Sequence, residues 1–146
     1  MIDLETRLRL EADFPSVAEF LAENDGAAEA DMVEPGVYWL TMRPRTVPQE
    51  RYYVRVAWER YPGAPPSVRF AMAIGGDLNV TSAWPLVPNY RPSSFDICMP
   101  FTKEGFALHA EWAGGREAWP TVGNPFLWVV DLMQDHLDRL YQGRSA

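Results

Sequence analysis

The stretch of sequence that decides the fold is Tyr61-Pro62-Gly63-Ala64-Pro65-Pro66-Ser67-Val68-Arg69-Phe70. Its three prolines fix φ and remove backbone donors, so they predict a stiff reversal of the chain. After the turn, Val68 and Phe70 alternate with polar residues, which is typical of a half-buried strand. Taken by itself, this turn is a structural device and indicates no activity.

Three segments, one of them beginning at this turn, have the composition and alternation of strands. Residues 36–42 are rich in aromatic and branched residues, and residues 52–59 alternate strictly. In residues 68–74 the apolar side chains are Val68, Phe70, Met72 and Ile74. Because the gaps between the segments are short, they predict an antiparallel meander.

A helix is predicted at the N-terminal end, over residues 2–24, because apolar residues recur there at helical spacing. These residues are Leu4, Leu8, Ala12, Val17, Phe20 and Leu21. Pro15 interrupts the pattern, so we expect a kink or two shorter helices. The alternation of Leu8, Leu10, Ala12 and Phe14 leaves a strand open, but the Leu, Arg, Glu and Ala content favours the helix.

A second helix is predicted after Asn124, which is a good N-cap, and Pro125, which suits the first helical position. Its apolar positions are Phe126, Val130, Met133, Leu137 and Tyr141. Gly143 is a stop signal, and His136 is expected on the charged, exposed side. Residues 75–123 are expected to be mostly irregular, with a short hairpin around residues 106–111. The sequence thus predicts one α+β domain over residues 1–146.

Composition excludes several classes of function. The chain has 146 residues, of which 47% are hydrophobic, and a net charge of −7. This charge argues against nonspecific binding to nucleic acid. One cysteine and two histidines do not make a metal cluster, and a single cysteine cannot form an internal disulfide. The acidic N-terminus lacks a signal core and no apolar run spans a membrane, so we predict a cytoplasmic protein.

The proline turn is also the hallmark of a known fold. Its form, Y-P-x-x-P-P-x-V-x-F, resembles the ubiquitin-conjugating enzyme family and its noncatalytic relatives, the RWD and UEV domains. In catalytic members the turn is followed by His-Pro-Asn, Ile-Cys-Leu and a Trp near a Pro before a helix. This chain has, in that order, Val87-Pro88-Asn89, Ile97-Cys98-Met99, Trp119-Pro120 and the helix from Asn124. The resemblance covers residues 36–141.

The chain departs from the family pattern in several places. Val87 replaces the motif histidine, and the segments from Phe70 to Pro88 and from Cys98 to Trp119 are longer than usual. One C-terminal helix follows, where eukaryotic enzymes generally have three. The compact form is similar to bacterial ubiquitin-conjugating-like proteins, which act beside a ThiF-like activating enzyme and a ubiquitin-like modifier.

The resemblance implies a chemistry for three residues. Cys98 would carry a ubiquitin-like protein as a thioester and pass it to an amine of a protein substrate, without a cofactor or a metal. Asn89 would donate a hydrogen bond to the oxyanion. His109 would help to deprotonate the amine in place of the missing histidine. Asp96 would oppose thiolate formation if it lay close to the sulfur.

Each of these residues also has a purely structural interpretation. A lone cysteine is often a small core residue, a lone histidine is more often structural, and Trp112 and Trp119 are expected to pack. The chain would then be a noncatalytic RWD- or UEV-like interaction module, or a small α+β binding protein whose proline turn is coincidental. By resemblance to the family, residues 2–12 and the turn at Pro62–Pro66 are expected to meet the activating enzyme or a ligase. Arg7 and Glu11 would share a helix face there.

Overall fold

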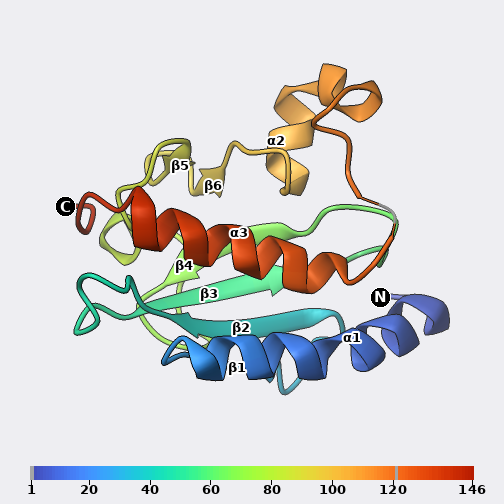
Figure 1. Ribbon diagram of the computed structural model, residues 1–146, viewed down its shortest axis with the longest axis horizontal. Coiled ribbons are helices and arrows are strands. Elements are labelled where there is room, and N and C mark those ends of the chain that lie inside the picture. The colour runs from blue at the N-terminus through green and yellow to red at the C-terminus, as the bar shows by residue number, and fades with distance from the viewer. Residues whose placement is uncertain (1, 121) are drawn as a thin grey trace.

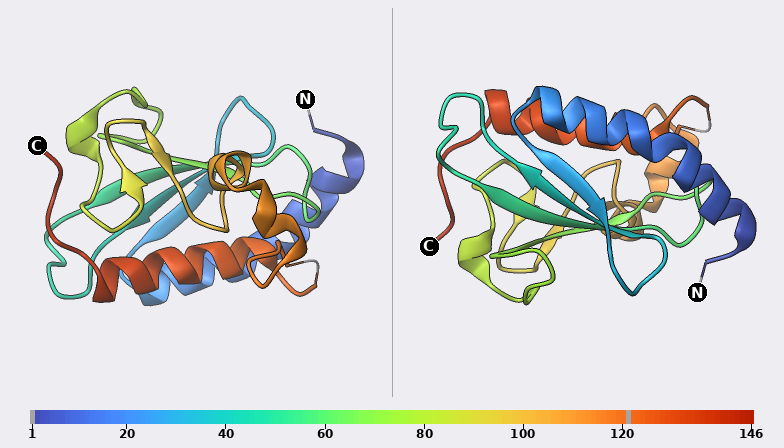
Figure 2. Two further views of the ribbon diagram at one scale, coloured as in Figure 1. Left: turned by 90° about the horizontal axis from the view of Figure 1, so that it is seen from above. Right: turned by 90° about the horizontal axis from the view of Figure 1, so that it is seen from below.

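The computed structural model describes residues 2–120 and 122–146. At its centre is a four-stranded antiparallel sheet whose strand order follows the chain, as expected for a meander (Figure 1). The strands are β1 (Ala27–Ala30), β2 (Val37–Met42), β3 (Tyr52–Ala57) and β4 (Ser67–Ala71). The helices α1 (Leu4–Glu23) and α3 (Pro125–Arg139) lie on the same side of the sheet (Figure 2). The predicted α+β class and antiparallel sheet are confirmed.

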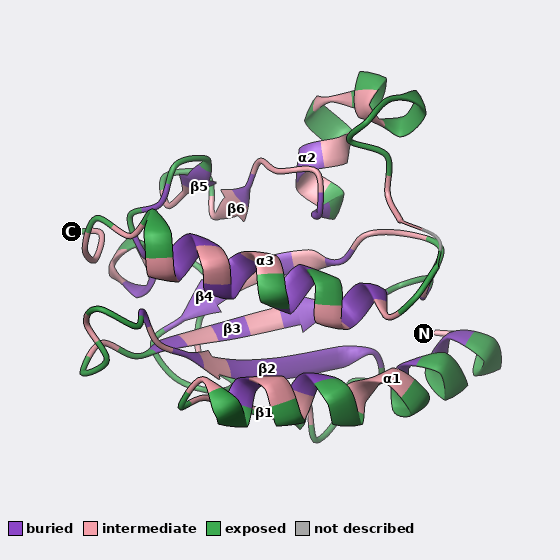
Figure 3. Cartoon of the chain, viewed as in Figure 1, coloured by how far each residue is buried: buried purple, intermediate pink, exposed green. Residues whose placement is uncertain are grey.

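Alternation along β3 explains which face of the sheet is covered. Tyr52, Val54 and Val56 are completely buried, whereas the residues between them are partly exposed. The register places Leu40 of β2 and Phe70 of β4 beside Val54, and both are also fully buried. Figure 3 shows buried stretches along β2, β3 and β4 next to the two helices. Each large apolar side chain buried here stabilises the fold by about 1.5–3 kcal/mol.

The N-terminal helix is unbroken but not straight. Asp3 caps it by accepting the Thr6 N–H at 2.8 Å, and Pro15 lies inside it. The helix axis bends part-way along (Figure 2), as a proline that removes one backbone donor predicts. Leu4 and Leu8, expected on the apolar stripe, are 69% and 54% exposed. The expectation was wrong for these two residues because the first turns of α1 project past the end of the sheet (Figure 1).

The C-terminal helix begins as predicted. Asn124 accepts the Leu127 N–H at 2.9 Å, and Pro125 is the first helical residue. His136 was expected at the surface, but it is only 7% exposed, with its Nδ1 2.9 Å from the Tyr90 hydroxyl. A segment far away in the sequence covers this side of the helix, and burial lowers the pKa of the imidazole.

Two strands of the sheet, β4 and β1, differ from the sequence expectation. The strand predicted to reach Ile74 stops at Ala71, and Met72 and Ile74 are exposed. In addition, β1 forms from an Ala-rich segment that has no strand pattern. Gly26 precedes it, where a Cβ would stand 2.3 Å from the Thr41 carbonyl oxygen. Close approach of the two backbones therefore requires glycine at this position.

The region between β4 and α3 is more ordered than predicted. It contains 3₁₀ turns at Thr81–Ala83 (η1) and Ala110–Gly114 (η2), the strands β5 (Tyr90–Arg91) and β6 (Asp96–Ile97), and helix α2 (Lys103–Leu108). The hairpin predicted around residues 106–111 was wrong, because Thr102 caps a helix there by accepting the Gly105 N–H at 3.0 Å. None of the helices in the described residues is long and apolar enough to cross a membrane.

Candidate functional site

The motif residues Asn89 and Cys98 face each other across the β5–β6 ribbon. Tyr90 pairs with Ile97 and Arg91 with Asp96. The Cys98 N–H donates to the Asn89 carbonyl oxygen at 2.9 Å, which extends this register by one pair. Sequence placed the two residues nine positions apart, and the ribbon makes them opposite neighbours.

Burial shows which side of the ribbon the site occupies. Tyr90 and Ile97 are 4% and 0% exposed, so this pair faces the core. Asn89 is exposed and Cys98 is partly exposed. Because side chains alternate along a strand, the pairs on either side of Tyr90 and Ile97 turn outward. The thiol thus lies in the partly solvated layer rather than in the hydrophobic core.

The charged side chains beside the thiol, Arg91 and Asp96, form an ion pair with each other. The Arg91 guanidinium donates two hydrogen bonds to Asp96, at 2.7 and 2.8 Å. This bidentate bond raises the pKa of Arg91, and the negative charge of a Cys98 thiolate raises it further. Arg91 thus offsets the charge of the Asp96 carboxylate, and the expectation that Asp96 opposes thiolate formation stays a prediction. Sequence reasoning missed Arg91, because residues 75–123 were expected to be mostly irregular and nothing in the sequence indicated the β5–β6 ribbon.

Asn89 has an unusual backbone conformation for a residue other than glycine. Its φ is +70°, in the left-handed region that asparagine tolerates better than most residues. Its side-chain Nδ2 is 3.9 Å from the Met99 sulfur, a weak contact with the residue after Cys98. Within the described residues no stronger acceptor engages this amide, so its N–H groups remain available to another acceptor.

The residues after Cys98 are fixed by α2. The Thr102 hydroxyl donates to the Ile97 carbonyl oxygen at 2.5 Å while it caps the helix. Gly105 is buried against Met99, where a Cβ would lie 2.2 Å from the Met99 carbonyl oxygen. The helix thus packs directly on the backbone that carries the thiol.

The proline turn contacts the same helix. The Lys103 N–H donates to the Pro66 carbonyl oxygen at 2.8 Å, and the Ser67 hydroxyl donates to Glu104 at 2.7 Å. On the other side of the turn, the Trp119 indole N–H donates to the Pro62 carbonyl oxygen at 2.7 Å. Motifs spread over some 60 positions of the sequence are thus connected by hydrogen bonds.

Tyr61, the first residue of the turn, joins the two long helices. Its hydroxyl donates to the carboxylate of Asp13 in α1 and accepts the Phe126 N–H of α3 at 3.2 Å. Burial and the hydrogen bond to Asp13 both raise the pKa of this phenol. The sequence pattern marked Tyr61 as a motif residue, but nothing in it indicated these partners.

His109 is not joined to the thiol. Its ring stacks on Trp112, with centroids 4.3 Å apart, and its Nδ1 lies 3.0 Å from the Glu111 carboxylate. No hydrogen bond in the described part of the chain links it to Cys98. Val87, at the place of the motif histidine, is 5% exposed and belongs to the core. Val87 therefore packs in the core, and His109 makes contacts at the surface.

A groove of about 380 Å³ lies between the start of α1 and the proline turn. Its lining residues are Asp3, Glu5, Thr6, Arg9, Arg60, Tyr61, Pro62 and Gly63. The Thr6 hydroxyl accepts the Tyr61 N–H at 3.1 Å and fixes the two walls relative to each other. The two segments expected to meet a partner thus form one continuous surface.

Within residues 2–120 and 122–146, no three His, Cys, Asp or Glu side chains are grouped so that they can hold a metal ion. Comparison of the chain with models of protein families, with curated proteins and with solved structures gives no match.

Proposed function

We propose that the protein is a ubiquitin-conjugating-like enzyme that carries a ubiquitin-like protein on Cys98. The observation that carries the proposal is the register of the β5–β6 ribbon, which sets Asn89 opposite a partly exposed Cys98. The resemblance of the proline turn to the family, and its hydrogen bond to α2, support the same assignment.

The chemistry is two successive acyl transfers. The Cys98 thiolate attacks the carbonyl carbon of the modifier's C-terminal thioester on a ThiF-like activating enzyme, whose own thiolate leaves. An amine nitrogen of the protein substrate then attacks the new thioester, loses a proton to solvent, and expels the Cys98 thiolate as the amide forms.

Asn89 acts in the second step. Its amide N–H donates to the oxygen that becomes negative when the amine adds to the thioester. Charging of Cys98 requires the sulfur, whereas aminolysis also requires this donor. Loss of one such donor lowers a rate by roughly 100- to 1,000-fold.

Charging of Cys98 is tested by incubating the protein with ATP and with an activating enzyme and a modifier that come from the same source. Wild type is expected to give a product that reductant removes. Cys98→Ser is expected to give at most a reductant-resistant ester, and Cys98→Ala none. Equal charging of Cys98→Ala and wild type would refute the assignment.

The role of Asn89 is tested with a substitution that suits its backbone. Asn89→Gly removes the amide and still accepts a φ of +70°, so it separates chemistry from strain. It is expected to charge normally and to discharge to an amine roughly 100-fold more slowly. Ser93→Ala, in the exposed loop of the same ribbon, is the matched control and should discharge normally.

The activating enzyme is proposed to dock on α1 and the proline turn. Leu4 and Leu8 are exposed there, and Arg7 and Glu11 pair at 3.5 Å on the same helix. Replacing Arg7 and Glu11 together with alanine should weaken partner binding without a large change in melting temperature, because exposed pairs contribute only about 0–1 kcal/mol. Leu108→Ser, at an equally exposed leucine of α2, is the control. Unchanged affinity of the double variant on titration would refute this docking surface.

A noncatalytic interaction module is the second candidate. It is favoured by the position of His109, which stacks on Trp112 and is bonded to Glu111 instead of the thiol. This candidate predicts that the partner binds α1 and the turn equally well in wild type and in Cys98→Ala, and that neither protein is charged.

A further inference from the structure

Residues 142–145, which we call the strap, run antiparallel to residues 84–86 and are bonded to them along the backbone. The hydrogen bonds are Leu86 N–H to the Gly143 carbonyl oxygen at 2.7 Å, Gln142 N–H to the Leu86 carbonyl oxygen at 2.8 Å, and Ser145 N–H to the Trp84 carbonyl oxygen at 2.9 Å. Both views in Figure 2 show the C-terminal end of the chain next to η1, which precedes this segment. The strap therefore holds the stretch of chain that leads to the candidate site.

Directly after the bonded segment the chain makes the turn Val87-Pro88-Asn89-Tyr90. The Tyr90 N–H donates to the Val87 carbonyl oxygen at 3.0 Å and closes this turn. A proline at its second position and a φ of +70° at its third are the features of a type II turn, which asparagine tolerates there. Val87 packs in the core, whereas Leu86 is 38% exposed and is held by its two hydrogen bonds to the strap. The strap thus fixes the direction in which the chain enters the turn that carries Asn89.

Arg144 anchors the strap to two other parts of the fold. Its guanidinium donates to the Ser82 carbonyl oxygen at 3.0 Å and to the Arg51 carbonyl oxygen at 2.9 Å. It also lies over the Tyr52 ring, 4.2 Å from the centroid, and 3.4 Å from the Glu50 carboxylate. A planar guanidinium can bind these acceptors together because its donors point in fixed directions.

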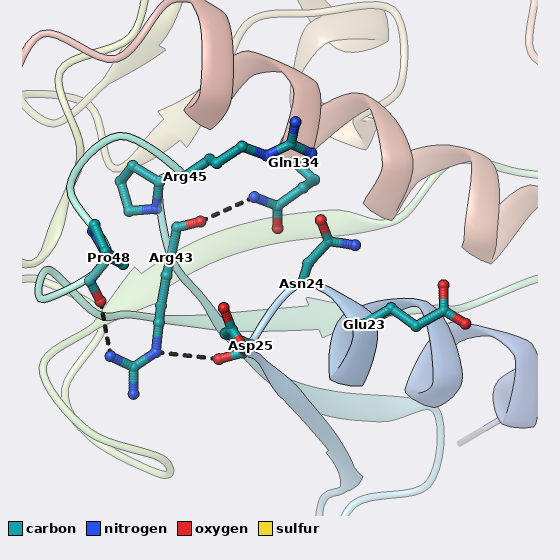
Figure 4. A pocket seen from close by; sticks show the side chains of 8 residues that line it. Glu23, Asn24, Asp25, Arg43, Arg45, Pro48 and Gln134 are labelled. Carbon is teal, nitrogen blue, oxygen red and sulfur yellow. Dashed lines mark hydrogen bonds between the residues drawn. The ribbon is translucent and has the colours of Figure 1, made fainter.

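The loop between β2 and β3, which Arg144 contacts, is itself tied to both long helices (Figure 4). Arg43 donates to the carbonyl oxygens of Asp25, at 3.1 Å, and Pro48, at 2.8 Å. Gln134 of α3 donates to the Arg43 carbonyl oxygen at 2.9 Å. The loop is therefore connected to the end of α1 and to the middle of α3, and Arg144 joins the strap to this frame.

We propose that Arg144 is a positioning residue for Asn89 and acts through the strap. It holds residues 84–86 against the loop between β2 and β3, and the turn that follows then directs the Asn89 amide toward the cysteine end of the β5–β6 ribbon. The inference rests on the function proposed for Cys98, because it is the oxyanion of that reaction that the amide meets.

The first test compares the charging and discharge of Arg144→Ala with those of a matched control, Arg139→Ala. Arg139 pairs with Asp135 at the surface of α3, so its loss leaves the hydrogen bonds of the strap in place. Arg144→Ala is expected to charge as wild type does and to discharge to an amine about tenfold more slowly, because a displacement of about 1 Å can cost roughly 100-fold in rate. Arg139→Ala should match wild type in both steps. Discharge of Arg144→Ala at the wild-type rate would overturn the proposal.

A double variant separates positioning from a general loss of structure. In Asn89→Gly the donor is absent, so the addition of Arg144→Ala should slow discharge further by less than about twofold. A second slowing of about tenfold would mean that Arg144 acts independently of Asn89, and it would overturn the proposal.

An NMR spectrum of the isotopically labelled full chain tests the strap without the modifier. The side-chain amide signals of Asn89 should shift in Arg144→Ala and stay in place in Arg139→Ala. If wild type is not charged, the function proposed for Cys98 fails, and these signals still decide whether Arg144 positions the amide. Unchanged signals in Arg144→Ala overturn the positioning role even if charging succeeds.

If Arg144→Ala does not fold, Arg144→Lys decides by the same measurements. Lysine keeps the charge and the aliphatic stem, but its single nitrogen does not reproduce the fork that binds the Ser82 and Arg51 carbonyl oxygens. Its discharge is expected to be slower than that of wild type, and an unchanged rate together with unchanged Asn89 signals would refute the role of Arg144.

Discussion

Substitution of Gly105 by alanine tests whether α2 holds the backbone next to Cys98. A Cβ at this position would stand 2.2 Å from the Met99 carbonyl oxygen, 2.8 Å from its nitrogen and 3.0 Å from its carbonyl carbon. A normal contact therefore requires α2 and the Met99 backbone to separate by about 1 Å. The neighbour is backbone, so no flexible side chain can move aside.

The opposing contributions can be compared. Overpacking of this kind costs about 1–3 kcal/mol, and weakening the Thr102 cap costs up to about 1 kcal/mol more. Alanine gains about 1 kcal/mol over glycine in helix propensity. We expect a net loss of about 0–3 kcal/mol in the free energy of unfolding, measured by urea denaturation.

The same variant should expose the thiol. Moving Met99 loosens the residue beside Cys98, so iodoacetamide is expected to alkylate Cys98 faster than in wild type. Gly114→Ala is the control, since a Cβ there meets nothing within 4 Å, and it should leave alkylation unchanged. If Gly105→Ala matches wild type in both stability and alkylation, the packing argument for this segment is refuted.

Three further predictions concern the supports of the fold, each measured as a free energy of unfolding. Tyr61→Phe should cost about 1–3 kcal/mol because the Phe126 N–H loses its acceptor; a neutral result would contradict this role. Asn124→Ala should cost about 0.5–2 kcal/mol as the loss of an N-cap, with a smaller change arguing against the cap. Burial gives His136 a pKa below its unfolded value of 6.5, so the unfolded state binds the proton more tightly, and stability should fall as the pH drops below 6.5. An NMR titration that shows His136 protonating above pH 6.5 beside Tyr90 would contradict the last prediction.

Local signals in the sequence determined the main elements of this protein. Period-two alternation located β3 because one face of the sheet is buried and the other partly exposed. The cap at Asn124 and the proline after it located the start of α3, because both act on the first turn of the helix alone. Short gaps between strands then made an antiparallel meander the simplest connection.

Only the tertiary structure decided which residues meet. His136 lies on the polar side of α3 by sequence, yet it is buried because the β5–β6 ribbon brings Tyr90 onto it. Leu4 has the spacing of a core residue, yet it is exposed because the sheet ends before α1 does. Burial depends on what another segment covers, and helical periodicity carries no information about that.

The candidate site, too, was determined partly by the sequence and partly by the tertiary structure. The sequence supplied Cys98 and Asn89 through their order after the proline turn. Their opposition and the Arg91–Asp96 pair beside them follow from the register of a two-residue ribbon. The sequence alone does not specify the register of so short a ribbon, so it does not specify this pairing. The sequence therefore determined which chemical groups are present, and the packing of the segments decided which of them act together.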